Sequence, residues 1–377
     1  MIPEISSIEI AQLASGDCLS IQVYKFCGAT PGKKAYLQAN LHGAEIVGNA
    51  VVQQLFEFFS DLDKTQLQGE IWMVPACNPL ATNQRSHHFS SGRYNPYDGT
   101  DWNRIFWDYE KQIDDIEDFA RTQLDFDTKT IRKNFLDRIL QEFSRLTQKI
   151  DAPSSVPFDE RYRYTLQSLC IDADYVIDIH SSTNRSIDYL YCFQTREESA
   201  KYFLLNYGIL LNEYDGDAFD EAFLKPWLAL EKQLEKLGKS TYFDIESWTL
   251  ELGSGMEMNP DSVYRGVRGI KNYLTGKKML DLSGFPLVQT LNQTVYFFSK
   301  SQFKKYYASR GGIVQSRVIL GTIVKPGQLL YQLLVITSRS PKVVEVRAEK
   351  AGMVFDLSTN HAVNQGEYVL SIWEQAR

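Results

Sequence analysis

Only five histidines occur in the 377-residue chain, and two of them stand directly after apolar segments that are typical of β-strands. His42 follows residues 35–41, and His180 follows residues 175–179. Active-site side chains of α/β proteins commonly lie just beyond the carboxyl ends of strands. Glu45 comes three residues after His42, at the beginning of a predicted helix. Positions i and i+3 share a face of a helix, so the imidazole and the carboxylate can converge on one ion.

Two histidines and one carboxylate form the ligand set of a catalytic zinc site, because they leave one of four coordination positions open for water. The His-x-x-Glu spacing alone is a weak signal, and the alternative is that both histidines only satisfy hydrogen bonds at strand ends. The second strand-end histidine favours the metal. We therefore expect one Zn²⁺ per chain, held by His42, Glu45 and His180, although the ligand set also suits other divalent metals.

A loop between the two ligand segments carries groups that suit an anionic substrate. Arg93 lies in this loop, and the adjacent pair Asn103 and Arg104 follows it. An amide beside a guanidinium fork suits a carboxylate bound in a bidentate manner, and a second arginine near the metal suits an oxyanion. The alternative is that these are surface arginines bonded to loop carbonyl groups.

A site that activates water also needs a general base. Glu251 interrupts an apolar segment shortly before Gly253, where a strand meets a loop. A carboxylate there can take a proton from water and pass it to a leaving amine. Glu246 is the competing carboxylate, and because five residues separate the two, they face opposite sides of a regular strand. At most one of the two is therefore expected to act as the general base.

Taken in order, these motifs resemble those of the succinylglutamate desuccinylase/aspartoacylase family, which is related to the zinc carboxypeptidases. The matching segments are His-Gly-Ala-Glu at 42–45, Asn-Pro at 78–79, the run from Arg93 to Arg104, Asp-Ile-His-Ser-Ser at 178–182 and Glu-Leu-Gly at 251–253. The resemblance implies zinc on His42, Glu45 and His180, with Glu251 activating the water. It also implies that Arg93 stabilises the oxyanion and that Asn103 and Arg104 hold a substrate carboxylate. Asp178, on the same strand face as His180, looks like the group that orients this ligand.

The chain departs from the family pattern around the Asn-Arg pair. Family members commonly have Leu before the pair and a Phe-Pro-Gly turn after it, whereas this chain has Trp102 and then Ile-Phe-Trp-Asp at 105–108. A segment with helical spacing of apolar residues follows directly, and we interpret residues 107–160 as a helical insertion whose charges form a solvated face. We expect these changes to alter the substrate pocket rather than the zinc chemistry.

The elements that position these residues fall into two parts. Strand-like and helix-like segments alternate over residues 1–284, which predicts an α/β domain with a mixed sheet flanked by helices, and the resemblance implies the zinc-carboxypeptidase arrangement. Over residues 285–377, β-branched residues alternate with Gly-based turns, which predicts a small all-β barrel. This part resembles a biotinyl/lipoyl barrel without the Met-Lys-Met hairpin that such carriers modify. We interpret it as a structural lid over the site.

Composition excludes several classes of protein. The 40 Lys and Arg against 47 Asp and Glu give a net charge of −7, which argues against binding to nucleic acid or to an anionic membrane surface. No apolar segment approaches the roughly 20 residues of a membrane span, and the first residues do not resemble a signal peptide. The five scattered cysteines are typical of a reducing cytoplasm, where we expect the protein to reside.

The sequence thus predicts a zinc-dependent deacylase that hydrolyses the amide bond of a small N-acylated amino acid or related amine. One alternative is a carboxypeptidase, although a lid that narrows the entrance disfavours long peptides. Another is a non-catalytic relative that binds zinc or a ligand, although binding alone needs no general base such as Glu251. The acyl group, the amine and the formation of a homo-oligomer stay open.

Overall fold

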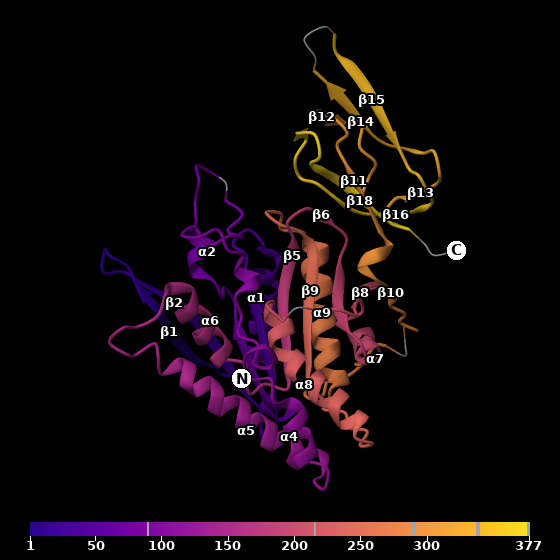
Figure 1. The fold of residues 1–377 in the computed structure, drawn as a ribbon. Coiled ribbons are helices and arrows are strands. Elements are labelled where there is room, and N and C mark those ends of the chain that lie inside the picture. Colours follow the sequence, from indigo (N-terminus) through magenta and orange to yellow (C-terminus); the bar gives the residue numbers. More distant parts are fainter. Residues whose placement is uncertain (89, 215, 289–290, 337–339, 375–377) are drawn as a thin grey trace.

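The computed structural model describes residues 1–88, 90–214, 216–288, 291–336 and 340–374. Its largest feature is a mixed sheet in which nine strands of the described residues take part, and the central strands β4, β3, β5 and β9 run parallel (Figure 1). From edge to edge the order is β1 (Glu4–Gln12), β2 (Cys18–Cys27), β4 (Gln68–Val74), β3 (Thr30–Ala39), β5 (Tyr175–Ser182), β9 (Glu246–Ser254), β7 (Tyr189–Phe193), β8 (Tyr207–Leu211) and β10 (Tyr296–Phe298).

Helices cover both faces of this sheet. Successive side chains of each central strand point to opposite sides, and apolar ones on both sides are buried against helices. On one face, Leu37 and Ile177 belong to a buried cluster with α1 (Val47–Asp61) and α9 (Pro260–Gly276). On the other face, Tyr36 and Val176 belong to a second cluster with α8 (Phe219–Lys236) and the helices between β4 and β5. The result is three layers, which confirms the prediction of an α/β fold with a mixed sheet flanked by helices.

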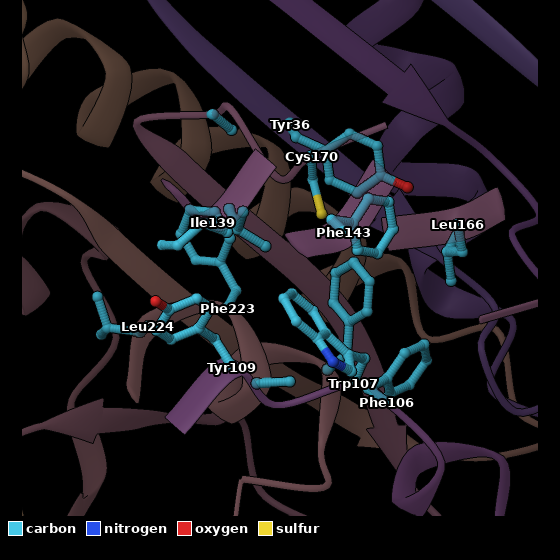
Figure 2. Packing of buried hydrophobic residues seen from close by; sticks show 14 of the residues in the cluster. Tyr36, Phe106, Trp107, Tyr109, Ile139, Phe143, Leu166, Cys170, Phe223 and Leu224 are labelled. Atoms are coloured by element: carbon cyan, nitrogen blue, oxygen red, sulfur yellow. The ribbon is translucent and has the colours of Figure 1, made fainter. Parts of the chain in front are cut away.

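The predicted insertion folds as helices that complete this second layer. They are α3 (Tyr109–Ile113), α4 (Ile116–Thr122) and α5 (Thr128–Thr147), and α6 (Phe158–Ser168) begins at the end of the predicted insertion and extends beyond it. One face of α5 buries Ile131, Phe135, Ile139 and Phe143 at helical spacing. Figure 2 shows Phe143 near Trp107, whose ring centre lies 5.4 Å from that of Phe143. The insertion is therefore part of the main hydrophobic core.

Short helices occupy the connections elsewhere. They are α2 (Pro79–Asn83), α7 (Glu197–Ala200), η1 (Lys64–Gln66), η2 (Trp102–Arg104), η3 (Lys201–Phe203) and η4 (Lys300–Gln302). No helix among the described residues is both long and apolar enough to cross a membrane.

The predicted all-β region is confirmed, and its described strands pair into two small sheets rather than into one closed ring. One sheet has the order β11 (Phe303–Tyr307), β18 (Tyr368–Glu374), β16 (Gly352–Leu357) and β13 (Ile323–Val324). The other has the order β15 (Lys342–Arg347), β14 (Leu329–Val335), β12 (Gly312–Gln315) and β17 (Ala362–Val363).

The all-β region is attached at the carboxyl end of β5, and Figure 1 shows it beyond that end of the large sheet. Strand β16 pairs with β6 (Arg185–Ser186), which follows β5 directly. Met353 and Phe355 of β16 pack in one buried cluster with Tyr189, Ile209 and Phe298 of the large sheet. Strand β10 joins the large sheet although it follows residue 284, and the predicted boundary there stays a prediction.

Replacement of Phe135 by Ala tests the insertion's part in the core. Its ring is fully buried and lies 5.1 Å from the rings of both Phe119 and Trp227, so its removal leaves a cavity. We expect the free energy of unfolding, measured by urea titration, to fall by about 3–5 kcal/mol. Phe126→Ala is the matched control, because this side chain is 44% exposed and its loss should cost under about 0.5 kcal/mol. Equal effects of the two changes would show that the insertion is not part of the core.

Candidate metal centre

His42 and Glu45 lie in the turn that connects β3 to α1. The prediction that Glu45 begins the helix is wrong, because α1 begins at Val47 and Glu45 precedes it. The turn is closed by the backbone N–H of Glu45, which donates to the carbonyl oxygen of His42 at 3.1 Å. The side-chain amide of Asn40 donates to the same carbonyl at 3.0 Å. A turn brings the two side chains together as the helix would have done.

Contacts with the neighbouring loop fix the position of this turn. Asn78, in the predicted Asn-Pro motif, donates from its side chain to the carbonyl oxygen of Leu41 at 3.1 Å and accepts from the backbone N–H of Ala81. Gly43 packs so closely that an added Cβ would lie 2.1 Å from the carbonyl oxygen of Ala81. Any other residue at position 43 would clash with the backbone of α2 and displace the ligand turn from it.

The carboxylate of Glu45 lies between the two predicted histidines. Its Oε1 is 2.9 Å from Nδ1 of His42, and its Oε2 is 2.8 Å from Nδ1 of His180. One ligand atom from each of the three residues lies within 4.8 Å of the others, and all three side chains are buried. The structure therefore brings together the three residues that the sequence proposed as metal ligands.

Further carboxylates fix the outward-facing nitrogen of each imidazole. Asp178 lies 2.8 Å from Nε2 of His180, on the same face of β5, and Asp101 lies 3.1 Å from Nε2 of His42. Metal-binding histidines are held in this way, which leaves the other nitrogen directed at the ion. Sequence reasoning missed Asp101, because loop closure rather than strand periodicity brings it to His42. The sequence signal that could have identified Asp101 was its position within the Arg93–Arg104 motif.

Electrostatics favour a cation at this position. Burial opposes the charged form of His180, but the carboxylates of Asp178 and Glu45 outweigh burial and raise its pKa. Burial likewise opposes ionisation of Glu45, yet His42 and His180 lower the pKa of this carboxyl well below its usual range. A buried carboxylate that faces two imidazole nitrogens fits a divalent ion that accepts two nitrogen ligands and one oxygen ligand.

Glu251 faces the same space from the adjacent strand. It is paired in register with His180 across β5 and β9, and its Oε2 is buried without a hydrogen-bond partner among the described residues. Burial and the nearby charge of Glu45 raise the pKa of Glu251 to about 7. The competing Glu246 is bonded to Lys277 and Tyr273 at the other end of β9. Of the two carboxylates, only Glu251 borders the candidate metal site.

Arg93 reaches the centre from the loop and is fixed by ion pairs. Its Nη2 lies 2.9 Å from Asp101, and its Nη1 lies 3.6 Å from Oε1 of Glu45. Nη1 also donates to the hydroxyl of Thr183 at 3.2 Å. The guanidinium group is thus beside the ligand set, within reach of negative charge that develops on a bound molecule.

A cavity of about 270 Å³ opens beside these groups. Asn103 and Arg104 line it, and the side-chain oxygen of Asn103 accepts from the backbone N–H of Phe219 at 2.8 Å. This bond anchors the amide at the first turn of α8. The expectation that Trp102 and Trp107 alter the pocket is not met by direct contact, because both are buried in the core and neither lines this cavity.

The carboxylates that bind the outward-facing imidazole nitrogens should contribute measurably to metal affinity. Asp101→Asn and Asp178→Asn each weaken the bond that orients a ligand imidazole, so we expect affinity for Zn²⁺ to fall about 10- to 100-fold in a chelator competition assay. Asp98→Asn is the matched control in the same loop, because Asp98 is exposed and bonds the backbone of Thr100 instead. Affinity that is unchanged in both variants would argue against this orienting role.

Comparisons with known proteins identify the family of the chain. A model of the succinylglutamate desuccinylase/aspartoacylase catalytic domain matches residues 31–276. An N-alpha-acetyl-L-2,4-diaminobutyric acid deacetylase from Halomonas elongata is 25% identical over 347 residues, which are 91% of this chain and 82% of that protein.

Two crystal structures share the architecture of the whole chain. A succinylglutamate desuccinylase/aspartoacylase family protein from Shewanella amazonensis is 29% identical and has a TM-score of 0.86, with 98% of each chain covered. A structure from Shewanella frigidimarina has a TM-score of 0.88 at 24% identity and covers 99% of this chain and 98% of its own. Since the family model spans well over half of the sequence, the chain belongs to the succinylglutamate desuccinylase/aspartoacylase family of deacylating hydrolases.

Proposed function

We propose that this protein is a zinc-dependent deacylase that hydrolyses the amide bond of a small N-acylated amino acid. The observation that carries the proposal is the ligand set of His42, Glu45 and His180 together with Glu251 of β9. Three ligand atoms within 4.8 Å of one another border the same cavity as Glu251, whose buried Oε2 has no hydrogen-bond partner in the described parts of the chain. A site that only binds metal has no need of this fourth group, whereas hydrolysis requires a base.

Each residue around the ligand set has a task in this proposal. When bound, Zn²⁺ supplies Lewis acidity, which polarises a carbonyl group and lowers the pKa of water toward about 7. Glu251 takes a proton from the attacking water and returns it to the nitrogen of the leaving amine as the carbon–nitrogen bond breaks. Arg93, held by Asp101, stabilises the negative charge that develops on the carbonyl oxygen.

Asn103 and Arg104 hold the substrate carboxylate in this proposal. Both line the cavity, and a guanidinium group offers two parallel donors to a carboxylate. The cavity volume of about 270 Å³ suits an amino-acid derivative better than a long peptide, which disfavours the carboxypeptidase alternative. The relative from Halomonas elongata supports an acyl amino acid as the substrate class, since its name gives an N-acetylated amino acid as its substrate.

The all-β region contributes to the entrance of the site in this proposal. Lys300 of η4, on the connection to that region, lines the cavity. We propose that the region is a barrel-like structural lid rather than a carrier of biotin or lipoate, because its hairpins lack the Met-Lys-Met sequence that such carriers modify. The five cysteines are free, which supports a cytoplasmic location.

Glu251→Gln tests the catalytic assignment. Gln has nearly the same shape but cannot accept the proton, so we expect kcat for an N-acetyl amino acid to fall about 10²- to 10⁴-fold. Zinc should remain bound, because Glu251 is not among the three ligand residues. The matched control is Glu257→Gln, an exposed carboxylate paired with Arg185, which should retain wild-type activity. Full activity of Glu251→Gln with zinc bound would refute the assignment of the base.

The same assignment predicts a pH dependence. Glu251 accepts a proton only when ionised, so kcat/KM should fall as the pH drops through the pKa of this carboxyl. Burial and Glu45 raise that pKa to about 7, and a bound cation moves it lower because positive charge favours the carboxylate. We expect an acidic limb with its midpoint at or below about pH 7 in a profile of kcat/KM. A rate that increases toward acid would contradict the proposed base.

A further inference from the structure

The charged groups that line the cavity have both signs. The proposed mechanism employs Glu45, Glu251 and Arg93, and it leaves four other charged residues for recognition of the substrate. Two are basic and two are acidic: Arg104 and Lys300, and Asp220 and Glu221. A substrate that carries only negative charge would match the first pair and be repelled by the second.

Asp220 is the acidic member with the best-defined position. It is the second residue of α8, and it is only 5% exposed. The hydroxyl of Thr249 donates to its Oδ2 at 2.7 Å, and the backbone N–H of Glu221 donates to its Oδ1 at 2.9 Å. Thr249 precedes Glu251 by two residues on the same face of β9, so the Asp220 carboxylate is held on the wall next to the proposed base.

No Lys or Arg in the described parts of the chain forms an ion pair with Asp220. Burial and the negative charge of Asp178 raise the pKa of this carboxyl, whereas the hydrogen bond from Thr249 and the charge of His180 only partly oppose the rise. The two groups that donate hydrogen bonds to this carboxylate are neutral, so no cationic side chain contacts it directly among the described residues. A cation that enters the cavity would therefore gain a fixed, desolvated carboxylate as its partner.

Arg104 and Asp220 act on the same stretch of the cavity wall. Tyr191 of β7 is paired with Thr249 of β9 and lines the cavity with both of them. Burial raises the pKa of Tyr191, the negative charges of Glu251 and Asp220 raise it further, and the positive charge of Arg104 opposes them. Tyr191 is thus close enough to Glu251, Arg104 and Asp220 to be affected by the charge of each. A small molecule in this space meets all three.

We propose that Asp220 determines specificity by binding a cationic group of the substrate. The substrate class is then an Nα-acyl amino acid whose short side chain ends in an ammonium group. Its carboxylate lies toward Arg104 and its ammonium group toward Asp220. This inference rests on the proposed deacylase function and adds to it the charge of the substrate side chain. An N-acyl dicarboxylic amino acid would place a carboxylate against Asp220 and is selected against.

The test compares three substrates: Nα-acetyl-L-2,4-diaminobutyrate, the uncharged Nα-acetyl-L-2-aminobutyrate and the anionic N-acetyl-L-aspartate. We expect the wild-type kcat/KM to be about 10- to 100-fold higher for the ammonium substrate than for the uncharged one, as for a hydrogen bond to a charged group. Asp220→Asn should remove this preference and leave the rate on the uncharged substrate within about threefold. The anionic substrate should be the poorest for the wild type and should improve in the variant.

Asp261→Asn is the matched control, because Asp261 is also the second residue of a helix but is exposed. It should leave all three rates unchanged. Equal loss on the charged and uncharged substrates in Asp220→Asn would indicate a structural role and overturn the assignment. A wild-type enzyme that does not prefer the ammonium substrate would overturn it as well.

Calorimetric binding of L-2,4-diaminobutyrate separates this inference from the proposed function. Binding that weakens at least tenfold in Asp220→Asn, in a protein that hydrolyses none of the three compounds, supports the role of Asp220 and refutes the deacylase. Hydrolysis of all three compounds with equal efficiency retains the deacylase and refutes the role of Asp220. Binding that is equal in wild type and variant refutes the role of Asp220 in either case.

Discussion

Glu45 is a buried carboxylate held between two buried imidazoles, and the positions of the other site residues follow from this arrangement. Removal of a carboxylate and two imidazoles from water is costly unless each polar atom has a partner. Glu45 supplies one oxygen to His42 and the other to His180, while Asp101 and Asp178 bind the outward nitrogens. Three separate segments must therefore meet within a few ångströms. The parallel strands β3 and β5 provide this, because both end at the same edge of the sheet.

The same edge explains how the remaining groups converge. Glu251 is paired in register with His180 and presents its carboxylate beside the ligand set. The loop that carries Arg93 closes over the ligands through Asp101, so that one carboxylate fixes both a ligand imidazole and a guanidinium group. The first turn of α8 borders the cavity through Asp220 and is bonded to Asn103 of the loop. A rigid sheet edge and two loops anchored by hydrogen bonds thus define the proposed substrate space.

Much of the site could be predicted from the sequence because the ends of apolar strands can be recognised in it. His42 and His180 end strongly apolar runs, and the odd spacing between Glu246 and Glu251 distinguished the two carboxylates before their surroundings were known. The structure places Glu246 in contact with Lys277 and leaves Glu251 beside His180. The α/β fold was predictable because strand-like and helix-like segments alternate along the chain, a pattern typical of a mixed sheet flanked by helices.

The parts that sequence patterns missed depend on packing between distant segments. Asp101 reaches His42 through loop closure, and Asp220 reaches the cavity through the placement of α8, neither of which has a periodic signature. The beginning of α1 was misplaced because the apolar stripe extends into the turn before Val47. Trp102 and Trp107 interrupt a substrate-binding motif in the sequence, yet both rings belong to the core that the helical insertion completes.

The metal content of the purified protein tests the central claim most directly. Elemental analysis compares the zinc content of three proteins: the wild type, His180→Ala and His88→Ala. The last is the control, because His88 is an exposed histidine. We predict about one zinc ion per chain in the wild type and in His88→Ala, and its loss in His180→Ala. A wild-type protein that stays free of metal after zinc is supplied, or a His180→Ala protein that retains the full complement, would contradict the account.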